Sequence, residues 1–387
     1  MASYIGQSNY RVKGSTDRLN PTQKQERLLS LDAFRGGTIA AMILVNNPGN
    51  GEAVYTPFEH AEWHGWTFTD LVFPFFLWIV GVAITFSFAK RIDRGDDRGK
   101  LFLHILRRSV SIFALGYFLN LFPTFDFANG RIPGVLQRIA ICYLIAGTIF
   151  LFTKVRGRIV WILGLLSVYW LLMKMVPVPG YGAGVLGVEG NLEQYIDSMF
   201  LKGHMYRLTR TQDPEGIVST LPAIATALFG TLAGQLLQAK RSMEEKTSWL
   251  FFSGNCLIFA GLMLSTWMPI NKKIWTSSFS VFMAGMASVV FACCYWLVDV
   301  KQWKRYSKPF IIYGMNAITV YALAGMVARL LGFIKVGGIS LHEYLYENLF
   351  APLAAPQNAS LMYAIANVLF FYLIAYGMYR KKWFVRL

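Results

Sequence analysis

The chain has 387 residues, of which 55% are hydrophobic and 15% are charged, and its mean hydropathy is +0.42. Soluble domains carry about 25% charged residues, so this composition argues against a soluble protein. Lys and Arg number 37 against 21 Asp and Glu, a net charge of +16. In so apolar a chain, membrane topology explains this excess better than nucleic-acid binding does. The sequence therefore predicts an integral membrane protein with no nucleic-acid partner.

The first 27 residues are polar and basic, and we expect a disordered cytoplasmic tail without a cleavable signal. Residues 28–387 contain repeated apolar runs of about the length that crosses a bilayer, so they are expected to form one transmembrane domain. This pattern predicts an all-α, polytopic bundle of about ten transmembrane helices. The runs lie at 31–47, 68–89, 101–122, 133–153, 158–176, 217–238, 248–268, 274–297, 309–332 and 361–380.

Alternate connections between these runs differ in their Lys and Arg content, which sets the orientation of a membrane protein. One side collects 26 of these residues and the other side nine. The rich side contains both termini, and we expect it to be cytoplasmic. The long connections 48–67, 177–216 and 333–360 then face outward, and long ordered connections often carry function.

Polar residues in the first span are candidates for chemistry, because a charge at the middle of a membrane costs roughly 2.5–3.5 kcal/mol on insertion scales. Asp32 and Arg35 lie three residues apart, so they can pair on one helix face. The pair is either a structural salt bridge or part of a site. Asn46 lies at the outward end of the same span.

The connection 48–67 has no Lys or Arg and ends in an unusual cluster just before Asp70 opens the second span. Its members are Glu59, His60, Glu62, Trp63 and His64. Histidine is suited to proton transfer near neutral pH, and nearby carboxylates can orient its ring. The cluster predicts an acid–base site around His60. The two histidines match no recognised zinc motif, so no metal is predicted.

Two arginines mark the start of the fourth span, Arg131 at its outward edge and Arg138 two turns deeper. An arginine at that depth needs an acid, a carbonyl group or a water-filled cavity, and Asp32 and Asp70 are candidate partners for Arg138. Asp213 and Glu215 precede the sixth span, where acids also stabilise a helix N-terminus.

On the predicted cytoplasmic side, arginines such as Arg108 and Arg386 suit anchoring to anionic lipid. Some of them also suit recognition of a phosphorylated ligand. Asn316, inside the ninth span, is a buried amide that can bond to a neighbouring helix.

Seven blocks in order resemble the heparan-α-glucosaminide N-acetyltransferase family of transmembrane acyltransferases, in its shorter bacterial form. The resemblance covers nearly the whole chain from residue 27. The blocks are RLLSLDAFRG at 27–36, FEHAEWHGWTFTDLVFPFF at 58–76, RIPGVLQRI at 131–139, YIDSMFLKGHMY at 195–206, DPEGI at 213–217, GMNAITVY at 314–321 and YRKKWF at 379–384. Compared with the lysosomal enzyme of this family, we expect a shorter protein without the luminal N-terminal domain, and His64 stands where that enzyme has Asn. Both differences leave the acceptor open.

The resemblance implies that acetyl-CoA from the cytoplasm donates an acetyl group to the amine of an extracytoplasmic glucosamine-type sugar or glycan. It places the family's active-site histidine on His60 and the neighbouring polar residues on Asp32, Asn46 and Asp70. We expect acetyl-CoA to contact Arg35, Arg108, Arg386 and Asn316. We expect the acceptor to contact Glu59, Glu62, Trp63, His64, Arg131 and Arg138. The resemblance also implies a homodimer in the bacterial cytoplasmic membrane.

Two alternative functions remain open from the sequence. One is O-acetylation of a surface polysaccharide. The other is proton-coupled transport through Asp32, Arg35, His60 and Arg138, although the sequence shows no repeat symmetry of the kind that transporters often carry.

Overall fold

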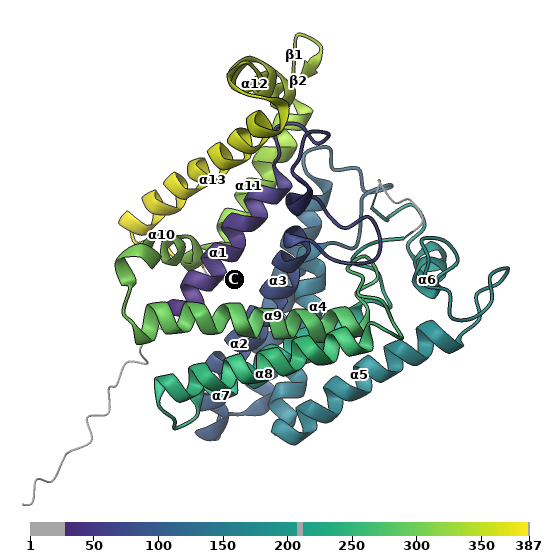
Figure 1. Cartoon of the computed structure of the whole chain (residues 1–387), viewed down its shortest axis with the longest axis vertical. Helices are drawn as coiled ribbons and strands as arrows, with labels where there is room; N and C mark the ends of the chain where they lie inside the picture. Colours follow the sequence, from purple (N-terminus) through teal and green to yellow (C-terminus); the bar gives the residue numbers. More distant parts are fainter. Residues whose placement is uncertain (1–27, 207–211, 386–387) are drawn as a thin grey trace, which may run out of the picture.

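The computed structural model describes residues 28–206 and 212–385, and over these ranges the chain is mainly helical (Figure 1). The predicted tail at 1–27 lies outside the described residues. The elements are α1 Leu29–Asn46, η1 Thr56–Phe58, α2 Phe68–Asp93, α3 Arg98–Leu121, α4 Val135–Phe152, α5 Val155–Met175, α6 Leu192–Phe200, α7 Thr220–Gln238, α8 Met243–Leu264, α9 Ser277–Tyr295, η2 Trp296–Val300, α10 Lys304–Met315, α11 Ala317–Phe333, β1 Lys335–Val336, β2 Ile339–Ser340, α12 Leu341–Leu349, η3 Ala351–Leu353 and α13 Pro356–Arg380.

Eight helices among the described residues are long and apolar enough to cross a membrane, or nine spans if the bent pair α10–α11 counts as one. This confirms the predicted polytopic bundle. The predicted ninth span is broken, because α10 and α11 meet at 70° around Asn316. Helix α1 is not among the eight. It carries Asp32 and Arg35, and other helices cover much of it, so it does not need a fully apolar surface.

Helix α1 is central to the bundle and packs against α2, α9, α10, α11 and α13 (Figure 1). Other close pairs are α2 with α7, α3 with α4, and α8 with α9. Helix α12 and the antiparallel β1–β2 hairpin lie together beyond the ends of α11 and α13 (Figure 1). Residues from the end of α1, the start of α2 and the start of α4 line one cavity, which is described below.

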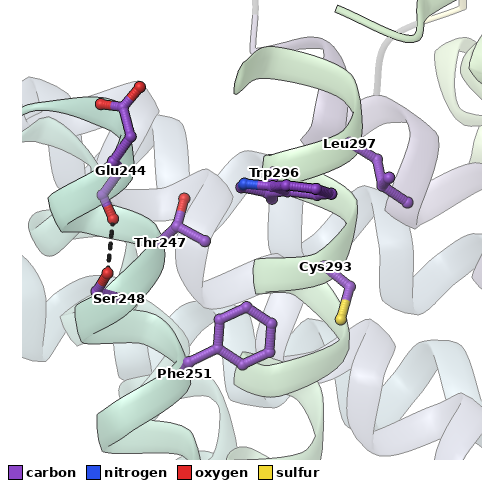
Figure 2. A pocket seen from close by; sticks show the side chains of 7 residues that line it. All are labelled: Glu244, Thr247, Ser248, Phe251, Cys293, Trp296 and Leu297. Atoms are coloured by element: carbon purple, nitrogen blue, oxygen red, sulfur yellow. Dashed lines mark hydrogen bonds between the residues drawn. The ribbon is translucent and has the colours of Figure 1, made fainter. Parts of the chain in front are cut away.

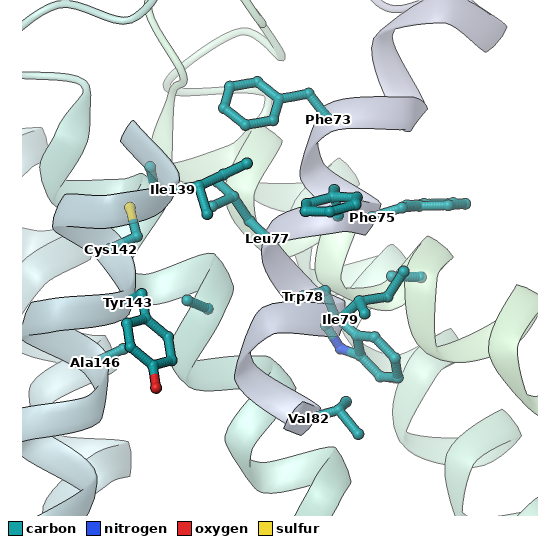
Figure 3. Packing of buried hydrophobic residues seen from close by; sticks show 14 of the residues in the cluster. Phe73, Phe75, Leu77, Trp78, Ile79, Val82, Ile139, Cys142, Tyr143 and Ala146 are labelled. Atoms are coloured by element: carbon teal, nitrogen blue, oxygen red, sulfur yellow. The ribbon is translucent and has the colours of Figure 1, made fainter. Parts of the chain in front are cut away.

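The interior between α2 and α4 is filled by large apolar side chains (Figure 3). Leu77 of α2 is fully buried, and Ile139 of α4 is 3% exposed. Trp78 of α2 is also fully buried, but it packs away from α4, against Phe34 of α1 and Phe291 of α9. Lipid chains are as apolar as leucine, so helices in a membrane associate through close packing more than through the hydrophobic effect. Close packing is therefore the main source of cohesion in this bundle.

Glycines allow two helix pairs to approach until their backbones touch. A Cβ atom on Gly81 of α2 would lie 1.9 Å from a backbone oxygen of α7, and one on Gly230 of α7 would lie 2.0 Å from a backbone oxygen of α2. The same holds for α1 and α10, where the distances are 1.8 Å at Gly36 and 1.9 Å at Gly314. No larger residue fits at these crossings without moving a helix.

A lateral pocket of about 570 Å³ lies between α8 and the end of α9, where the chain continues as the π-helical turn η2 (Figure 2). Phe251 reaches it from α8, and Cys293 and Trp296 reach it from the α9–η2 segment (Figure 2). The turn also fixes the start of α1, because Asp299 accepts a hydrogen bond of 3.2 Å from the backbone N–H of Ser30.

The α2–α7 crossing gives a first prediction. Gly81→Ala should destabilise the protein by about 1–3 kcal/mol, because the added methyl group collides with the α7 backbone. The matched control is Gly164→Ala in α5, where a Cβ atom meets nothing within 4 Å. The control should be neutral or stabilising, since alanine favours helix over glycine by about 0.5–1 kcal/mol. Thermal unfolding in detergent tests both variants, and equal melting temperatures would contradict the packing argument.

Candidate functional site

A polar cavity of about 610 Å³ opens where α1 and α3 end and where α2 and α4 begin, with α11 and the α8–α9 connection along its border. These segments come from widely separated parts of the sequence. Its polar lining residues include Asn46, His60, Thr69, Asn120, Arg131, Gln137, Tyr206, Glu215, Lys272, Lys273, Tyr321 and Arg329.

The pair formed by His60 and Asp70 is the chemical centre of this cavity. Asp70 is in the first turn of α2, where the helix dipole favours a carboxylate, and it is 1% exposed. Its Oδ2 atom accepts hydrogen bonds of 3.1 Å from the backbone N–H groups of Ala61 and Thr67. Its Oδ1 atom lies 2.6 Å from Nδ1 of His60. The helix start thus fixes the carboxylate, and the carboxylate fixes the ring.

This contact decides the tautomer of His60. A carboxylate only accepts hydrogen bonds, so in the neutral imidazole ring Nδ1 carries the proton and Nε2 is left with a lone pair. The His60 side chain is 46% exposed and borders the cavity, so Nε2 is accessible to a ligand. The structure thus brings two of the residues predicted to be catalytic into contact, and the arrangement suits a general base or a nucleophile. Their catalytic role stays a prediction.

Of the other residues predicted to be catalytic, Asn46 lies with His60 and Asp32 does not. Asn46 ends α1 and lines the same cavity. Asp32 is near the opposite end of that helix, fourteen residues away, which at 1.5 Å per residue is about 21 Å. There it pairs with Arg35, Nη1 to Oδ1, at 3.3 Å. The predicted pairing is thus confirmed, at a distance from His60.

Arg138 is 1% exposed and holds the segment that precedes α7. Its guanidinium donates hydrogen bonds to the carbonyl groups of Pro214 at 3.0 Å and Gly216 at 2.9 Å, and to the hydroxyl of Ser219 at 2.5 Å. It also lies over the ring of Trp275, 5.3 Å from its centroid. Carbonyl and hydroxyl oxygens thus accept from both terminal nitrogens of this guanidinium, while its buried Nε has no hydrogen-bond partner among the described residues. The predicted acidic partners, Asp32 and Asp70, do not take part in these contacts.

The segment held by Arg138 brings two acids to Arg131. Nε of Arg131 lies 2.8 Å from Oδ2 of Asp213, and its Nη2 atom bonds to both Asp213 and Glu215. Burial alone would lower the pKa of Arg131. The hydrogen bonds that Arg131 donates to Asp213, together with the negative charge of Glu215, outweigh burial and raise that pKa. Burial would raise the pKa of Glu215, yet the nearby Arg131 lowers it. The two acids therefore hold Arg131 at the cavity wall and do more than cap a helix.

Helix α6 carries two buried acids, Glu193 and Asp197, and Asp197 supports the same segment. Asp197 accepts hydrogen bonds from the backbone N–H groups of Asp213 at 3.1 Å and Ile217 at 3.0 Å. Burial raises the pKa of Asp197 to about 6. Burial and the neighbouring Asp197 raise the pKa of Glu193 well above its usual range.

Three basic residues at the cavity were not predicted as site residues, namely Lys272, Lys273 and Arg329. Nζ of Lys273 donates a hydrogen bond of 2.5 Å to the backbone oxygen of Glu62, which ties the α8–α9 connection to the His60 loop. Burial lowers the pKa of Lys273. No local pattern marks these residues, because they meet His60 only through the fold.

Four residues predicted to bind the acceptor do not line this cavity: Glu59, Glu62, Trp63 and His64. Nε1 of Trp63 donates a hydrogen bond of 2.9 Å to the backbone oxygen of Leu186 in the α5–α6 connection. His64 contacts the side chain of Asn271 at 3.3 Å, and burial lowers its pKa. The side chains of Trp63 and His64 thus hold the surrounding connections together. For all four residues, contact with an acceptor stays a prediction.

The described residues that were predicted to contact acetyl-CoA, namely Arg35, Arg108 and Asn316, do not line the His60 cavity. The guanidinium of Arg108 lies 5.1 Å from the ring centroid of Tyr143, and its buried Nε has no hydrogen-bond partner among the described residues. The amide of Asn316 donates to the backbone oxygen of Trp383 at 3.1 Å and accepts from the N–H of Val385 at 3.2 Å. Arg386 lies outside the described residues.

Comparison with known proteins bears out the resemblance seen in the sequence. Residues 27–267 match the family model "Heparan-alpha-glucosaminide N-acetyltransferase, catalytic". The chain is 30% identical to the heparan-alpha-glucosaminide N-acetyltransferase of Mus musculus over 419 residues and 31% identical to that of Homo sapiens over 418 residues. Each alignment covers 92% of this chain, which spans 60% and 59% of the length of these relatives.

The buried acids of α6 give a second prediction. Their raised pKa values mean that the folded chain binds protons that the unfolded chain releases. Their contribution to stability is therefore fully present below about pH 4 and is lost as the pH rises through about 6 for Asp197. This change amounts to about 3 kcal/mol for Asp197. Unfolding temperatures in detergent should accordingly fall between pH 5 and pH 8.

Glu193→Gln tests the cause of this fall. The amide imitates a protonated carboxyl group, so the variant should match or exceed the native protein at pH 8 and show a flatter pH dependence. Glu244→Gln, at an exposed position of α8, is the control and should leave the slope unchanged. A steeper slope in Glu193→Gln would contradict the assignment.

Proposed function

Because this chain belongs to the heparan-alpha-glucosaminide N-acetyltransferase family, we propose that it transfers the acetyl group of acetyl-CoA to the amine of a glucosamine-type sugar. The observation that carries the proposal is the His60–Asp70 pair, 2.6 Å apart beside a polar cavity. A histidine with an accessible Nε2 atom, next to the amide of Asn46, fits acyl transfer to an amine.

In the direct route, Nε2 of His60 takes a proton from the acceptor nitrogen as that nitrogen attacks the thioester carbonyl carbon. Asp70 stabilises the imidazolium that forms, and the amide of Asn46 donates a hydrogen bond to the developing oxyanion. The C–S bond then breaks, and the CoA sulfur takes the proton from His60. In the covalent route, Nε2 attacks the thioester carbonyl carbon and the C–S bond breaks, so CoA leaves as a thiolate and the acetyl group is held on Nε2. The acceptor amine then attacks this acetyl group, the bond from the acetyl carbon to Nε2 breaks, and the proton lost by the amine passes through the freed imidazole to the CoA thiolate.

The nucleotide end of acetyl-CoA would lie toward Arg35 and Arg108, with the pantetheine arm passing between helices to the cavity. Arginine recognises phosphate with two parallel hydrogen bonds, which suits this donor. Nε2 of Gln137, at the cavity, and Nε of Arg108 are buried without a hydrogen-bond partner among the described residues. Buried polar atoms normally have partners, so the unpaired Nε2 of Gln137 supports a polar ligand in the cavity, and the unpaired Nε of Arg108 separately supports one beside that arginine.

The sidedness of the reaction is part of the same proposal. The uneven distribution of Lys and Arg, 26 against nine, supports a cytoplasmic location for both termini and therefore for the donor's nucleotide. The His60 cavity, at the opposite end of α1 from Arg35, would then receive an acceptor from the outward side. A homodimer and a bacterial cytoplasmic membrane are inferred from the family alone.

Replacement of His60 gives a third prediction. His60→Ala should lower acetyl transfer by about 10²- to 10⁴-fold, the usual contribution of a positioned acid–base group, while acetyl-CoA binding stays measurable. His104→Ala, on the face of α3, is the control and should keep its activity. Radiolabelled acetyl-CoA measures transfer and binding in the same preparation. Full activity of His60→Ala would overturn the role assigned to His60.

Asp70→Asn gives a fourth prediction, which tests the tautomer. The backbone N–H groups of Ala61 and Thr67 would hold the amide oxygen of the new side chain and turn its NH₂ group toward His60. Nδ1 must then accept, so Nε2 carries the proton and cannot act as a base. We expect kcat to fall by about 10²- to 10⁴-fold with little change in acetyl-CoA affinity. Unchanged kcat would show that Asp70 does not set the tautomer.

A further inference from the structure

A second cavity, an apolar groove of about 420 Å³, runs along a different face of α1 between α2, α9 and α10. Its floor on α1 is formed by the small residues Ala33, Gly37 and Ala41, which recur at intervals of four and therefore share one face. The eight helical steps from Ala33 to Ala41 correspond to about 12 Å along the membrane normal if α1 stands upright. The groove is thus long enough to receive part of an extended hydrocarbon chain.

The borders of this groove face outward from the bundle. Phe68 of α2 is 42% exposed, Val290 of α9 is 39% exposed and Phe310 of α10 is 47% exposed. Apolar side chains that are exposed on a membrane-spanning bundle are in contact with lipid. A chain that lies in the bilayer can therefore enter the groove from the side.

The groove meets the His60 cavity at the start of α2. Phe68 lines the groove, Thr69 lines the polar cavity, and Val72, one turn further on, lines both. An apolar channel thus ends beside a polar cavity that holds a histidine base. This adjacency selects the occupant, because an ordinary lipid chain or the apolar face of a second copy would make no use of a polar cavity beside the groove.

We propose that the acceptor is an amphiphile, an amino sugar attached to a lipid whose hydrocarbon chain lies in the α1–α2–α9–α10 groove while its sugar lies at His60. The inference rests on the proposed function, because it names the class of acceptor for that reaction. The membrane would then hold the acceptor at the correct depth, and only the sugar would need to move into the cavity. Binding of the chain supplies positioning as well as affinity.

Alkyl glucosaminides of increasing chain length test the proposal with the full-length protein in nanodiscs. We expect kcat/KM to be about tenfold or more higher for dodecyl than for methyl glucosaminide. Gly37→Leu should fill the groove, and the nearest atom to a Cβ at this position is Cδ1 of Phe310 at 3.9 Å, an ordinary contact. This variant, and Ala41→Leu as a second variant, should bring the dodecyl-to-methyl ratio down to about one.

Ala260→Leu is the matched control. It lies in another apolar pocket, of about 590 Å³ between α5 and α8, which shares no lining residue with the groove or with the His60 cavity. This variant should keep the native ratio. A native ratio near one, or a ratio that falls equally in Ala260→Leu, would overturn the proposal.

Photocrosslinking separates this proposal from the proposed function, because it needs no turnover. A dodecyl glucosaminide with a diazirine at the chain end should label peptides of α1, α9 and α10, and Gly37→Leu should remove that label. Labelling of other helices alone would overturn the groove assignment. If neither glucosaminide is acetylated, the proposed function fails, and the labelled peptides still decide whether the groove binds the chain.

Discussion

The buried guanidinium of Arg138 is the interaction on which the functional region depends. An arginine that is 1% exposed must find its partners inside the protein, and two carbonyl groups of the segment before α7, together with the hydroxyl of Ser219, accept hydrogen bonds from its Nη1 and Nη2 atoms. The fixed segment presents Asp213 and Glu215 to Arg131, and Arg131 forms part of the cavity wall beside His60. The charge of Arg138 thus indirectly positions Arg131 in the cavity wall.

Local features of the sequence were enough to predict most of the fold. A run of about 20 apolar residues is a property of one segment, so the spans followed from the chain alone. The His60–Asp70 contact was also predictable, because only ten residues separate the pair and Thr67 with Asp70 marks a helix start. The break at Asn316 was not predicted, because no proline lies there. The polar atoms of the break are satisfied by Trp383 and Val385, which are distant in sequence.

The parts of the site that were missed depend on contacts between distant segments. Glu215, Lys272 and Arg329 reach one cavity from three connections or helices, and nothing in their local sequence distinguishes them from capping or interfacial residues. Asp32 was expected near His60, but the structure places it at the other end of α1. A helix keeps residues fourteen positions apart at its two ends, and the Asp32–Arg35 pair belongs to the end remote from the histidine.

The glycine crossings described above bear on how material passes through this bundle. The backbones of α1 and α10, and of α2 and α7, touch without intervening side chains, so sliding either pair would bring a side chain to a crossing that has no room for a Cβ atom. Alternating-access carriers work by such relative motion of helices. A bundle whose central helices pack this closely is better suited to remaining fixed. A long flexible donor such as acetyl-CoA would then extend between the helices, and only its acetyl group would pass from one face of the membrane to the other.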